Sequence, residues 1–141
     1  MDLIKEHNQR LEQLRVITGE AMKVYNKYKP GLMESAYEAA LKYLLEQKGF
    51  KVERQKMLPM YWDDVLLDQT YRLDLVVNDI IIELKAVQFV VADHRKQLWS
   101  YMNLTHTNQG MLINFGNKQG LLSEWYQRDP LMGDIEKVHL I

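Results

Sequence analysis

The strongest constraint on the fold is a pair of β-rich runs that are separated by only two residues. Tyr71–Val77 and Ile80–Ala86 consist mainly of apolar and β-branched side chains, and Asn78-Asp79 lies between them. A two-residue connection of this composition favours a β-hairpin with a type I′ turn. Such a short loop fixes the register of the two strands, so we expect Val77 to face Ile80.

Because side chains alternate between the two faces of a strand, this register divides the hairpin into two surfaces. The first is apolar and is expected to belong to the core: Leu73, Leu75, Val77, Ile80, Ile82 and Leu84. The second is mainly charged: Arg72, Asp74, Val76, Ile81, Glu83 and Lys85. On this second surface, Asp74 is expected opposite Glu83, and Arg72 opposite Lys85.

Two carboxylates that face each other across a hairpin repel, because their Cβ atoms lie only about 5 Å apart. A divalent cation would offset the repulsion, since Mg²⁺ prefers oxygen ligands, and Lys85 could then act on a water or on a phosphate. The alternative is a solvated ladder in which Asp74 pairs with Lys85 and Glu83 with Arg72. A surface ladder of that kind contributes little energy and no function. The spacing alone leaves both interpretations open.

Two helices are predicted to flank this hairpin. Leu32–Lys48 has helical periodicity, and Glu34 lies in its first turn on the same stripe as Tyr37. Glu34 is therefore either a ligand close to the sheet or a cap for free N–H groups at the start of the helix. Gly49 is a suitable residue to end this helix.

A further helix is predicted to begin with Asp93 as its N-cap and to end near Leu104. On this helix His94, Gln97 and Tyr101 share one stripe. They face either a polar cleft or solvent, and the pattern does not distinguish these. A lone histidine such as His94 is poor evidence for a metal ligand.

The remaining segments complete an α/β fold. A helix is predicted over residues 3–28 and ends at Lys29-Pro30-Gly31, and Phe50–Trp62 is expected to be extended, with a turn at Asp63-Asp64. Further strands are expected at Gln109–Phe115 and, in the tail, at about 135–141. The order predicts a mixed sheet covered by helices on at least one face. With 141 residues, we expect one domain over residues 1–141.

The composition of the chain limits the classes of function that it can have. The formal net charge of −1 does not indicate nucleic-acid binding by charge alone, so a bound polyanion would need local positive charge or a metal ion. The chain has no cysteine, which excludes disulfides and fits a cytoplasmic location. The charged N-terminal segment is unlike a signal peptide, and no apolar run is long enough for a membrane span.

Several motifs together carry a family likeness. Asp74 followed across a tight turn by Glu83-Leu84-Lys85 resembles the D…(D/E)xK signature of the PD-(D/E)XK nuclease superfamily. Gly31, Glu34 and Tyr37 match the motif for which the GxxExxY group of that superfamily is named. Gln97-Leu98-Trp99-Ser100-Tyr101 and Leu112–Gly116 look like the helix and closing strand of the same group. The likeness covers residues 31–116.

This resemblance implies a restriction-endonuclease-like core of helix, three strands, helix and strand, here with an extra N-terminal helix. It implies that Asp74 and Glu83 hold Mg²⁺ or Mn²⁺, with Glu34 completing or supporting the metal shell. Lys85 would act on the attacking water, with Gln97 beside it. The side chains expected to line the cleft are Tyr37, Arg72, His94 and Tyr101.

Three functions follow from these features. The first is a metal-dependent nuclease that hydrolyses phosphodiester bonds in DNA or RNA. The second is a nuclease-like fold kept for binding nucleic acid or protein, with little or no catalysis. The third is a homo-oligomeric scaffold that associates through its N-terminal helix.

Overall fold

The computed structural model describes residues 3–139. Its elements follow in the order α1 Leu3–Tyr28, α2 Glu34–Gln47, β1 Val52–Trp62, β2 Val65–Val77, β3 Ile80–Lys85, α3 Ala92–Thr105, β4 Gln109–Asn114, β5 Leu122–Arg128 and β6 Ile135–Val138. The predicted order of helices and strands is confirmed, with one strand more than the sequence indicated. None of the helices in this described part combines the length and apolarity of a membrane-spanning segment.

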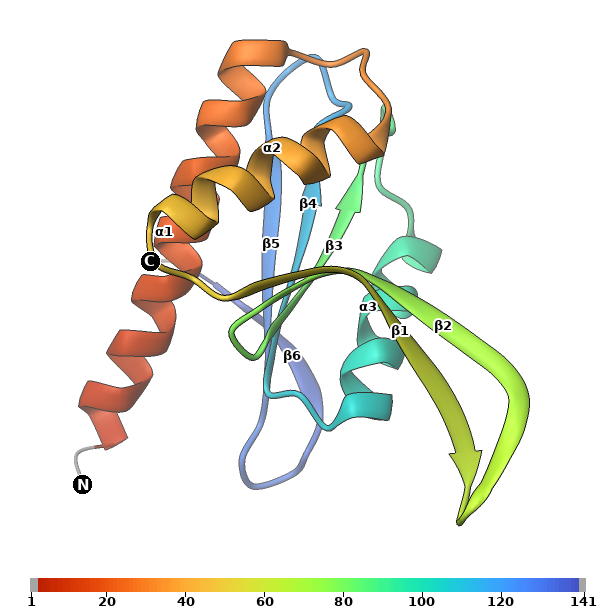
Figure 1. Ribbon diagram of the computed structural model, residues 1–141. Coiled ribbons are helices and arrows are strands. Elements are labelled where there is room, and N and C mark those ends of the chain that lie inside the picture. Colours follow the sequence, from red (N-terminus) through yellow and green to blue (C-terminus); the bar gives the residue numbers. More distant parts are fainter. Residues whose placement is uncertain (1–2, 140–141) are drawn as a thin grey trace.

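The six strands form one mixed sheet in the order β1-β2-β3-β4-β5-β6 (Figure 1). β3 and β4 are parallel and are joined through α3, whereas the other neighbouring strands are antiparallel. The mixed α/β sheet predicted from the sequence is therefore confirmed. The central strands β3 and β4 are buried along almost their whole length, as expected of strands with helices on both faces.

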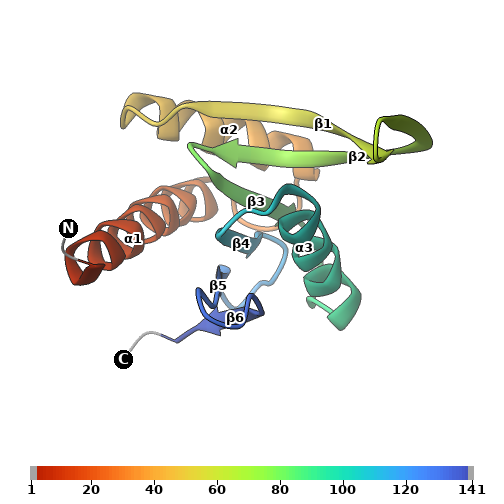
Figure 2. The same ribbon diagram turned by 90° about the horizontal axis from the view of Figure 1, so that it is seen from below.

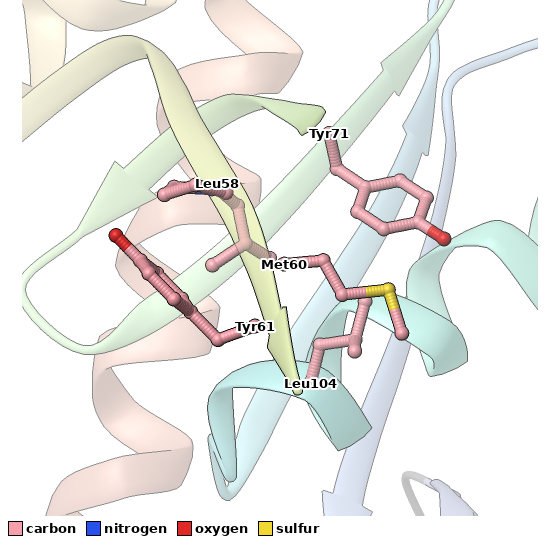
Figure 3. Close-up of a pocket in the computed structure, with 6 residues that line it drawn as sticks. Leu58, Met60, Tyr61, Tyr71 and Leu104 are labelled. Carbon is pink, nitrogen blue, oxygen red and sulfur yellow. The ribbon is translucent and has the colours of Figure 1, made fainter. Parts of the chain in front are cut away.

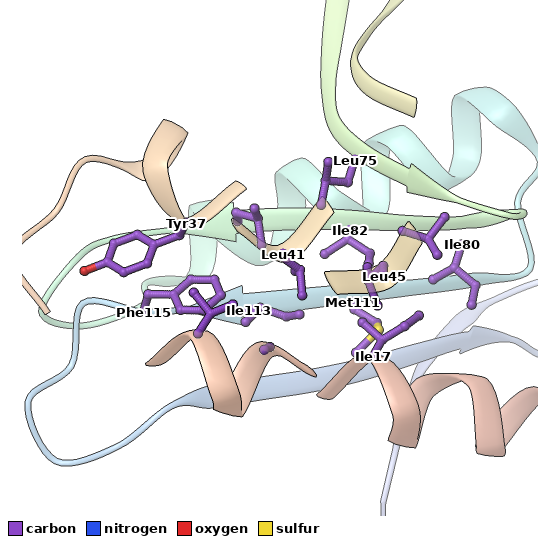
Figure 4. Packing of buried hydrophobic residues seen from close by; sticks show 14 of the residues in the cluster. Ile17, Tyr37, Leu41, Leu45, Leu75, Ile80, Ile82, Met111, Ile113 and Phe115 are labelled. Atoms are coloured by element: carbon purple, nitrogen blue, oxygen red, sulfur yellow. The ribbon is translucent and has the colours of Figure 1, made fainter. Parts of the chain in front are cut away.

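Helices cover both faces of the sheet, with α1 and α2 on one side and α3 on the other (Figure 2). The larger core lies under α1 and α2 and includes Ile17, Leu41, Leu45, Leu75, Ile82, Met111 and Ile113 (Figure 4). The smaller core lies under α3 and includes Leu73, Ile81, Leu98, Tyr101, Met102, Leu112 and Tyr126. Of the charged residues of β3, Glu83 is buried and Lys85 is half-buried.

Most predicted boundaries are confirmed. α1 spans residues 3–28 as expected, and α2 begins two residues later than predicted. Gly49 has a φ of 92°, and its N–H donates to the carbonyl of Glu46. The N–H of Phe50 donates to the carbonyl of Leu45. This pair of bonds is the Schellman motif, which explains why the helix ends at this glycine.

Two local predictions are wrong, and one strand was not predicted. Val91, not Asp93, is the N-cap of α3, and Asp93 lies in its first turn. The two-residue hairpin loop is present, but Asn78 alone of its two residues has a positive φ, whereas a type I′ turn needs both. The strand β5 was not predicted, because its Ser, Glu and Gln residues weaken the apolar signal of Trp125 and Tyr126.

The tail strand was predicted over 135–141 and ends at Val138. Residues 140 and 141 lie outside the described part of the chain.

A close backbone approach links β4 to the segment that follows β3. The side-chain amide of Asn114 accepts a hydrogen bond from the N–H of Val87 (3.0 Å) and donates one to its carbonyl (2.8 Å). A Cβ atom on Gly116 would overlap the backbone N and O of Val87. The absence of a side chain at residue 116 therefore lets this segment cross the end of β4.

We expect Gly116→Ala to lower the free energy of unfolding by about 1–3 kcal/mol, because backbone atoms must move to make room for the methyl group. The matched control is Gly19→Ala in α1, where an added Cβ contacts nothing within 4 Å. That change should stabilise the helix by about 0.5–1 kcal/mol. Urea unfolding of both variants checks the prediction, which is contradicted if the two changes have the same sign.

Candidate active site

The predicted register of the β2–β3 hairpin is confirmed for the residues that form backbone pairs. Val77 faces Ile80, and Leu75 faces Ile82. The backbone pairing then stops, so the expected backbone pair of Asp74 with Glu83 does not form. Instead, the N–H of Leu84 donates to the Asp74 carboxylate at 2.8 Å. A side chain thus takes the place of a backbone acceptor at this point of the ladder.

β2 changes the face of its side chains at Asp74. Leu75 packs in the core under α1 and α2, whereas Leu73 packs in the core under α3. The prediction that both share one face is therefore wrong, although both are buried. On the neighbouring strand, Gln55 has a φ of 54° and makes no backbone pair, while Arg54 and Lys56 on either side of it do. This local irregularity turns Asp74 toward β3.

Glu83 is 3% exposed, and one of its oxygens, Oε2, has no hydrogen-bond partner among residues 3–139. Burial is the main cause that raises the pKa of Glu83 to about 9. The neighbouring Asp74 carboxyl group raises it further, and Lys85 opposes the shift. The two acidic groups predicted to share a site are therefore in contact.

Lys85 lies between the acidic pair and α3. Its Nζ is 3.5 Å from Glu83 Oε1 and donates to Gln97 Oε1 at 3.0 Å. Gln97 in turn donates through Nε2 to the hydroxyl of Tyr101 at 2.9 Å. Burial, followed by the charge of Glu83, raises the pKa of Tyr101, and the hydrogen bond from Gln97 opposes the shift. These groups form a chain from β3 into α3.

The alternative charge ladder requires ion pairs between Asp74 and Lys85 and between Glu83 and Arg72. Neither is among the ion pairs that the structure contains within residues 3–139. Arg72 is exposed, and strand pairing has ended before it could face Lys85. In a solvated ladder both carboxylates would be exposed, whereas here Glu83 is buried and Asp74 is half-buried.

Glu34 is the first residue of α2 and lies near Asp74 and Lys85 of the hairpin. Its side chain is exposed, yet partial desolvation by the surrounding protein raises the pKa of its carboxyl group. Lys85 lowers this pKa, and Asp74 raises it. Glu34 therefore lies within the electrostatic reach of the hairpin residues. No side-chain cap closes the start of α2, so the capping alternative gains no support from this helix.

Two of the expected cleft residues have structural contacts instead. Tyr37 is fully buried and stacks on Phe115, with ring centroids 4.7 Å apart, so it does not line an open cleft. Its hydroxyl donates to the carbonyl of Lys29 and accepts from the N–H of Leu32. His94 accepts the N–H of Val91 through Nδ1 at 3.2 Å, which caps its own helix.

Comparison with known proteins identifies the family. A sequence model described as the PD-(D/E)XK nuclease superfamily matches residues 12–126. The chain belongs to the PD-(D/E)XK nuclease superfamily. No curated protein and no solved structure matches it. The mixed sheet with helices on both faces is consistent with the restriction-endonuclease-like fold of this superfamily.

PD-(D/E)XK nucleases generally use divalent metals, which bind through acidic side chains. Within residues 3–139 no three Asp, Glu or His side chains are close enough together to hold a metal ion. The contact between Asp74 and Glu83 nevertheless supplies two carboxyl groups, and Glu83 Oε2 is buried without a partner. A buried oxygen without a partner lowers the stability of the fold unless a ligand binds it. A hard divalent cation is such a ligand, because it prefers oxygen atoms. The pair therefore fits a metal, with Glu34 further out.

Sequence reasoning missed the residues that hold α2 over the PD-(D/E)XK hairpin. Glu38 is 2% exposed and accepts hydrogen bonds from Arg54 (2.6 Å) and Gln55 (2.9 and 2.8 Å). It lies one turn after Glu34 and binds β1 where that strand passes Asp74. The second Glu of the Glu34-x-x-x-Glu38 spacing was the available signal, because it falls on the half of α2 that faces the sheet.

A second missed group joins α3 to the unpredicted strand β5. Arg95 donates two hydrogen bonds to Glu124 (2.7 and 2.8 Å), and Tyr126 donates a third at 2.7 Å. Burial would raise the pKa of Glu124, but these bonds and the charges of Arg95 and Lys137 outweigh it and hold the pKa at about 2. This fully paired carboxylate fixes α3 against the sheet, in contrast to Glu83, whose Oε2 has no hydrogen-bond partner among the described residues.

The raised pKa of Glu83 predicts how stability depends on pH in metal-free protein. Between the ordinary value of 4.5 and about 9, the folded state holds a proton that the unfolded state releases. The contribution of Glu83 to stability is therefore fullest below about pH 4.5 and is lost as the pH rises toward 9. We expect Glu83→Gln to remove this loss and to raise Tm at pH 8 by at least about 3 °C, which corresponds to about 1 kcal/mol.

Thermal unfolding in chelator across pH 5–9 measures this effect. Glu53→Gln, a surface carboxylate on β1 paired with Lys56, serves as the control with the same change of charge. If Glu83→Gln follows the wild-type pH profile in parallel, as the control should, Glu83 does not titrate in this range.

Proposed function

We propose that this protein is a metal-dependent nuclease of the GxxExxY group that hydrolyses phosphodiester bonds with Mg²⁺ or Mn²⁺. The observation that carries the proposal is the buried, unpartnered Oε2 of Glu83 in contact with Asp74 and next to Lys85. A structural carboxylate in a core is expected to be fully paired, as Glu124 is. Buried carboxylates that are not fully paired are found preferentially at functional sites.

In this proposal, Asp74 and Glu83 hold the metal, and Glu34 supports its outer ligands. When bound, the ion would polarise the scissile phosphate and lower the pKa of a bound water. Asp74 is already oriented by the N–H of Leu84, which leaves its remaining lone pairs for a ligand. Glu83 is held in a dry setting, where its charge interacts more strongly than it would in water.

Lys85 is proposed to act on the attacking water or on the charge that develops at the phosphate. Its side chain is held from one side by Glu83 and from the other by Gln97. Gln97 is oriented by Tyr101, whose ring packs edge-on against Tyr71. Gln97 and Tyr101 are therefore proposed as positioning residues that keep the Lys85 ammonium group at the entrance to the acidic pair.

In this proposal, the glycine and the tyrosine of the GxxExxY motif position its glutamate. Gly31 has a φ of 126°, which a residue with a side chain rarely adopts. Tyr37 bonds to both sides of that turn, at Lys29 and Leu32. The glycine and the tyrosine thus determine where α2 begins, and Glu34 is its first residue. This supports a role for Gly31 and Tyr37 in positioning Glu34.

A binding module without catalysis remains the second candidate. The observation that favours it is the 3.5 Å approach of Lys85 to Glu83, which occupies both residues with each other in the metal-free protein. The formal net charge of −1 also gives no general attraction for nucleic acid. On this candidate, Lys85 and Glu83 would keep their contact and no metal would bind.

The first experiment measures cleavage of labelled single- and double-stranded DNA and RNA with Mg²⁺, with Mn²⁺ and with chelator. We expect metal-dependent cleavage that falls at least about 100-fold in Lys85→Ala, as is usual when a positioned catalytic group is removed. Lys51→Ala is the control, since Lys51 lies beside the Asn78 turn at the opposite end of β3. Equal activity of the two variants would exclude the proposed role of Lys85.

Metal binding is tested separately by calorimetry and thermal unfolding. Mn²⁺ at 100 times its dissociation constant should stabilise the wild type by about 2.7 kcal/mol. Asp74→Asn should abolish this gain, because a neutral amide is a poorer ligand for the ion. Asp79→Asn, in the exposed hairpin turn, should keep it. Absence of any metal effect on the wild type would favour the binding module.

A further inference from the structure

The hairpin of β1 and β2 extends well beyond the rest of the sheet (Figure 1). Its tip has large apolar side chains with little cover, and Trp62 is 70% exposed. The exposed apolar residues of the tip are Tyr61, Trp62, Val65 and Leu66. A patch of this kind on a projecting element is typical of an interaction surface.

The base of this hairpin is held in place. Leu58 and Tyr71 pack against the core under α3, and together with Met60 and Leu104 they line a small pocket of about 240 Å³ (Figure 3). Tyr71 also packs edge-on against Tyr101. The tip is therefore presented on an anchored support, which lowers the entropic cost of binding a partner.

The charges of the tip limit the choice of partner. Asp63, Asp64 and Asp68 are exposed, and none of the ion pairs within residues 3–139 involves them. No Lys or Arg occurs between Lys56 and Arg72. The tip therefore repels a phosphate backbone, and two tips packed against each other would bring six carboxylates together. A complementary surface must be apolar and positively charged.

Such a surface lies between α1 and α2 of the same chain. It is a groove of about 530 Å³ lined by Lys23, Val24, Lys27, Tyr28, Ala36, Ala39, Ala40, Tyr43 and Leu44. Its lining contains two lysines and no acidic residue. Lys23 is paired with Glu20 at 2.8 Å, whereas no ion pair within residues 3–139 involves Lys27. The small side chains from α2 leave room for a flat ring, and Tyr28 and Tyr43 supply aromatic walls. Lys27 lies 5.7 Å from the centre of the Tyr28 ring.

We propose that the β1–β2 tip of one copy of this chain docks into the groove between α1 and α2 of a second copy. Trp62 would enter above the alanines of α2, and Asp63 and Asp64 would approach Lys27. A buried aromatic of this size removes about 150–250 Å² from water. The tip and the groove are different surfaces, so the contact is heterologous and joins copies head to tail.

A mixing experiment with charge-reversed variants tests the proposal. The tip variant carries Asp63→Lys and Asp64→Lys, and the groove variant carries Lys27→Glu and Ala39→Glu. Far-UV circular dichroism and thermal unfolding establish that each is folded. Light scattering coupled to gel filtration at low salt, from about 1 to 500 μM protein, gives the masses. Asp79→Lys, in the other hairpin turn, is the control for a change of charge alone.

We expect the wild type and the control to rise above the chain mass of 16.7 kDa with concentration. Each variant alone should stay at that mass. An equimolar mixture should form a complex of two chains, because the tip variant keeps an intact groove and the groove variant keeps an intact tip. The variant that carries all four changes should stay at the chain mass, because it has neither an intact tip nor an intact groove.

Three results would overturn the proposal. A wild type that stays monomeric over this range excludes the second copy as the occupant and leaves the tip for another protein. Association that persists in either variant places the interface elsewhere. A mixture that forms no complex shows that the tip and the groove are not partners. The proposal does not depend on nuclease activity, so these outcomes are separate from those of the cleavage assay.

Discussion

The hydrogen bond from the N–H of Leu84 to the Asp74 carboxylate is the interaction on which the geometry of the candidate site depends. It compensates for a place where the ladder between β2 and β3 ends early. At the same residue, β2 turns its side chains from the core under α1 and α2 to the core under α3. One carboxylate therefore completes the sheet, allows two cores to form and brings an acidic group against Glu83.

The site combines burial and repulsion in a way that does not favour folding of the metal-free protein. Glu83 is buried beside a second carboxyl group, and its Oε2 has no partner among the described residues. The same sheet contains Glu124, equally buried, whose oxygens are held by Arg95 and Tyr126. The contrast indicates that the incomplete pairing of Glu83 is local and is not a general property of this core.

Residues far from one another in the sequence position the site. The turn at Gly31 is held by Tyr37, and Glu38 ties α2 to β1 next to Asp74. Asn114 and Gly116 let the segment after Lys85 cross the end of β4. Each of these contacts joins segments from different elements. Stability and site geometry are therefore linked, because losing one contact moves a functional side chain without touching it.

The sequence by itself determined the hairpin, its register at Val77 and Ile80, the helices and the mixed α/β class. These features depend on local periodicity and on the residues of the turns, both of which can be recognised in the sequence. Only the tertiary structure decided that Leu73 and Leu75 point into different cores, that Tyr37 is buried and that β5 joins the sheet. It alone also decided that Glu83 Oε2 has no hydrogen-bond partner among the described residues. These features arise where the ladder breaks at Asp74 and where α1, α2 and α3 pack on the sheet. Contacts between distant segments, which no local pattern encodes, determine them.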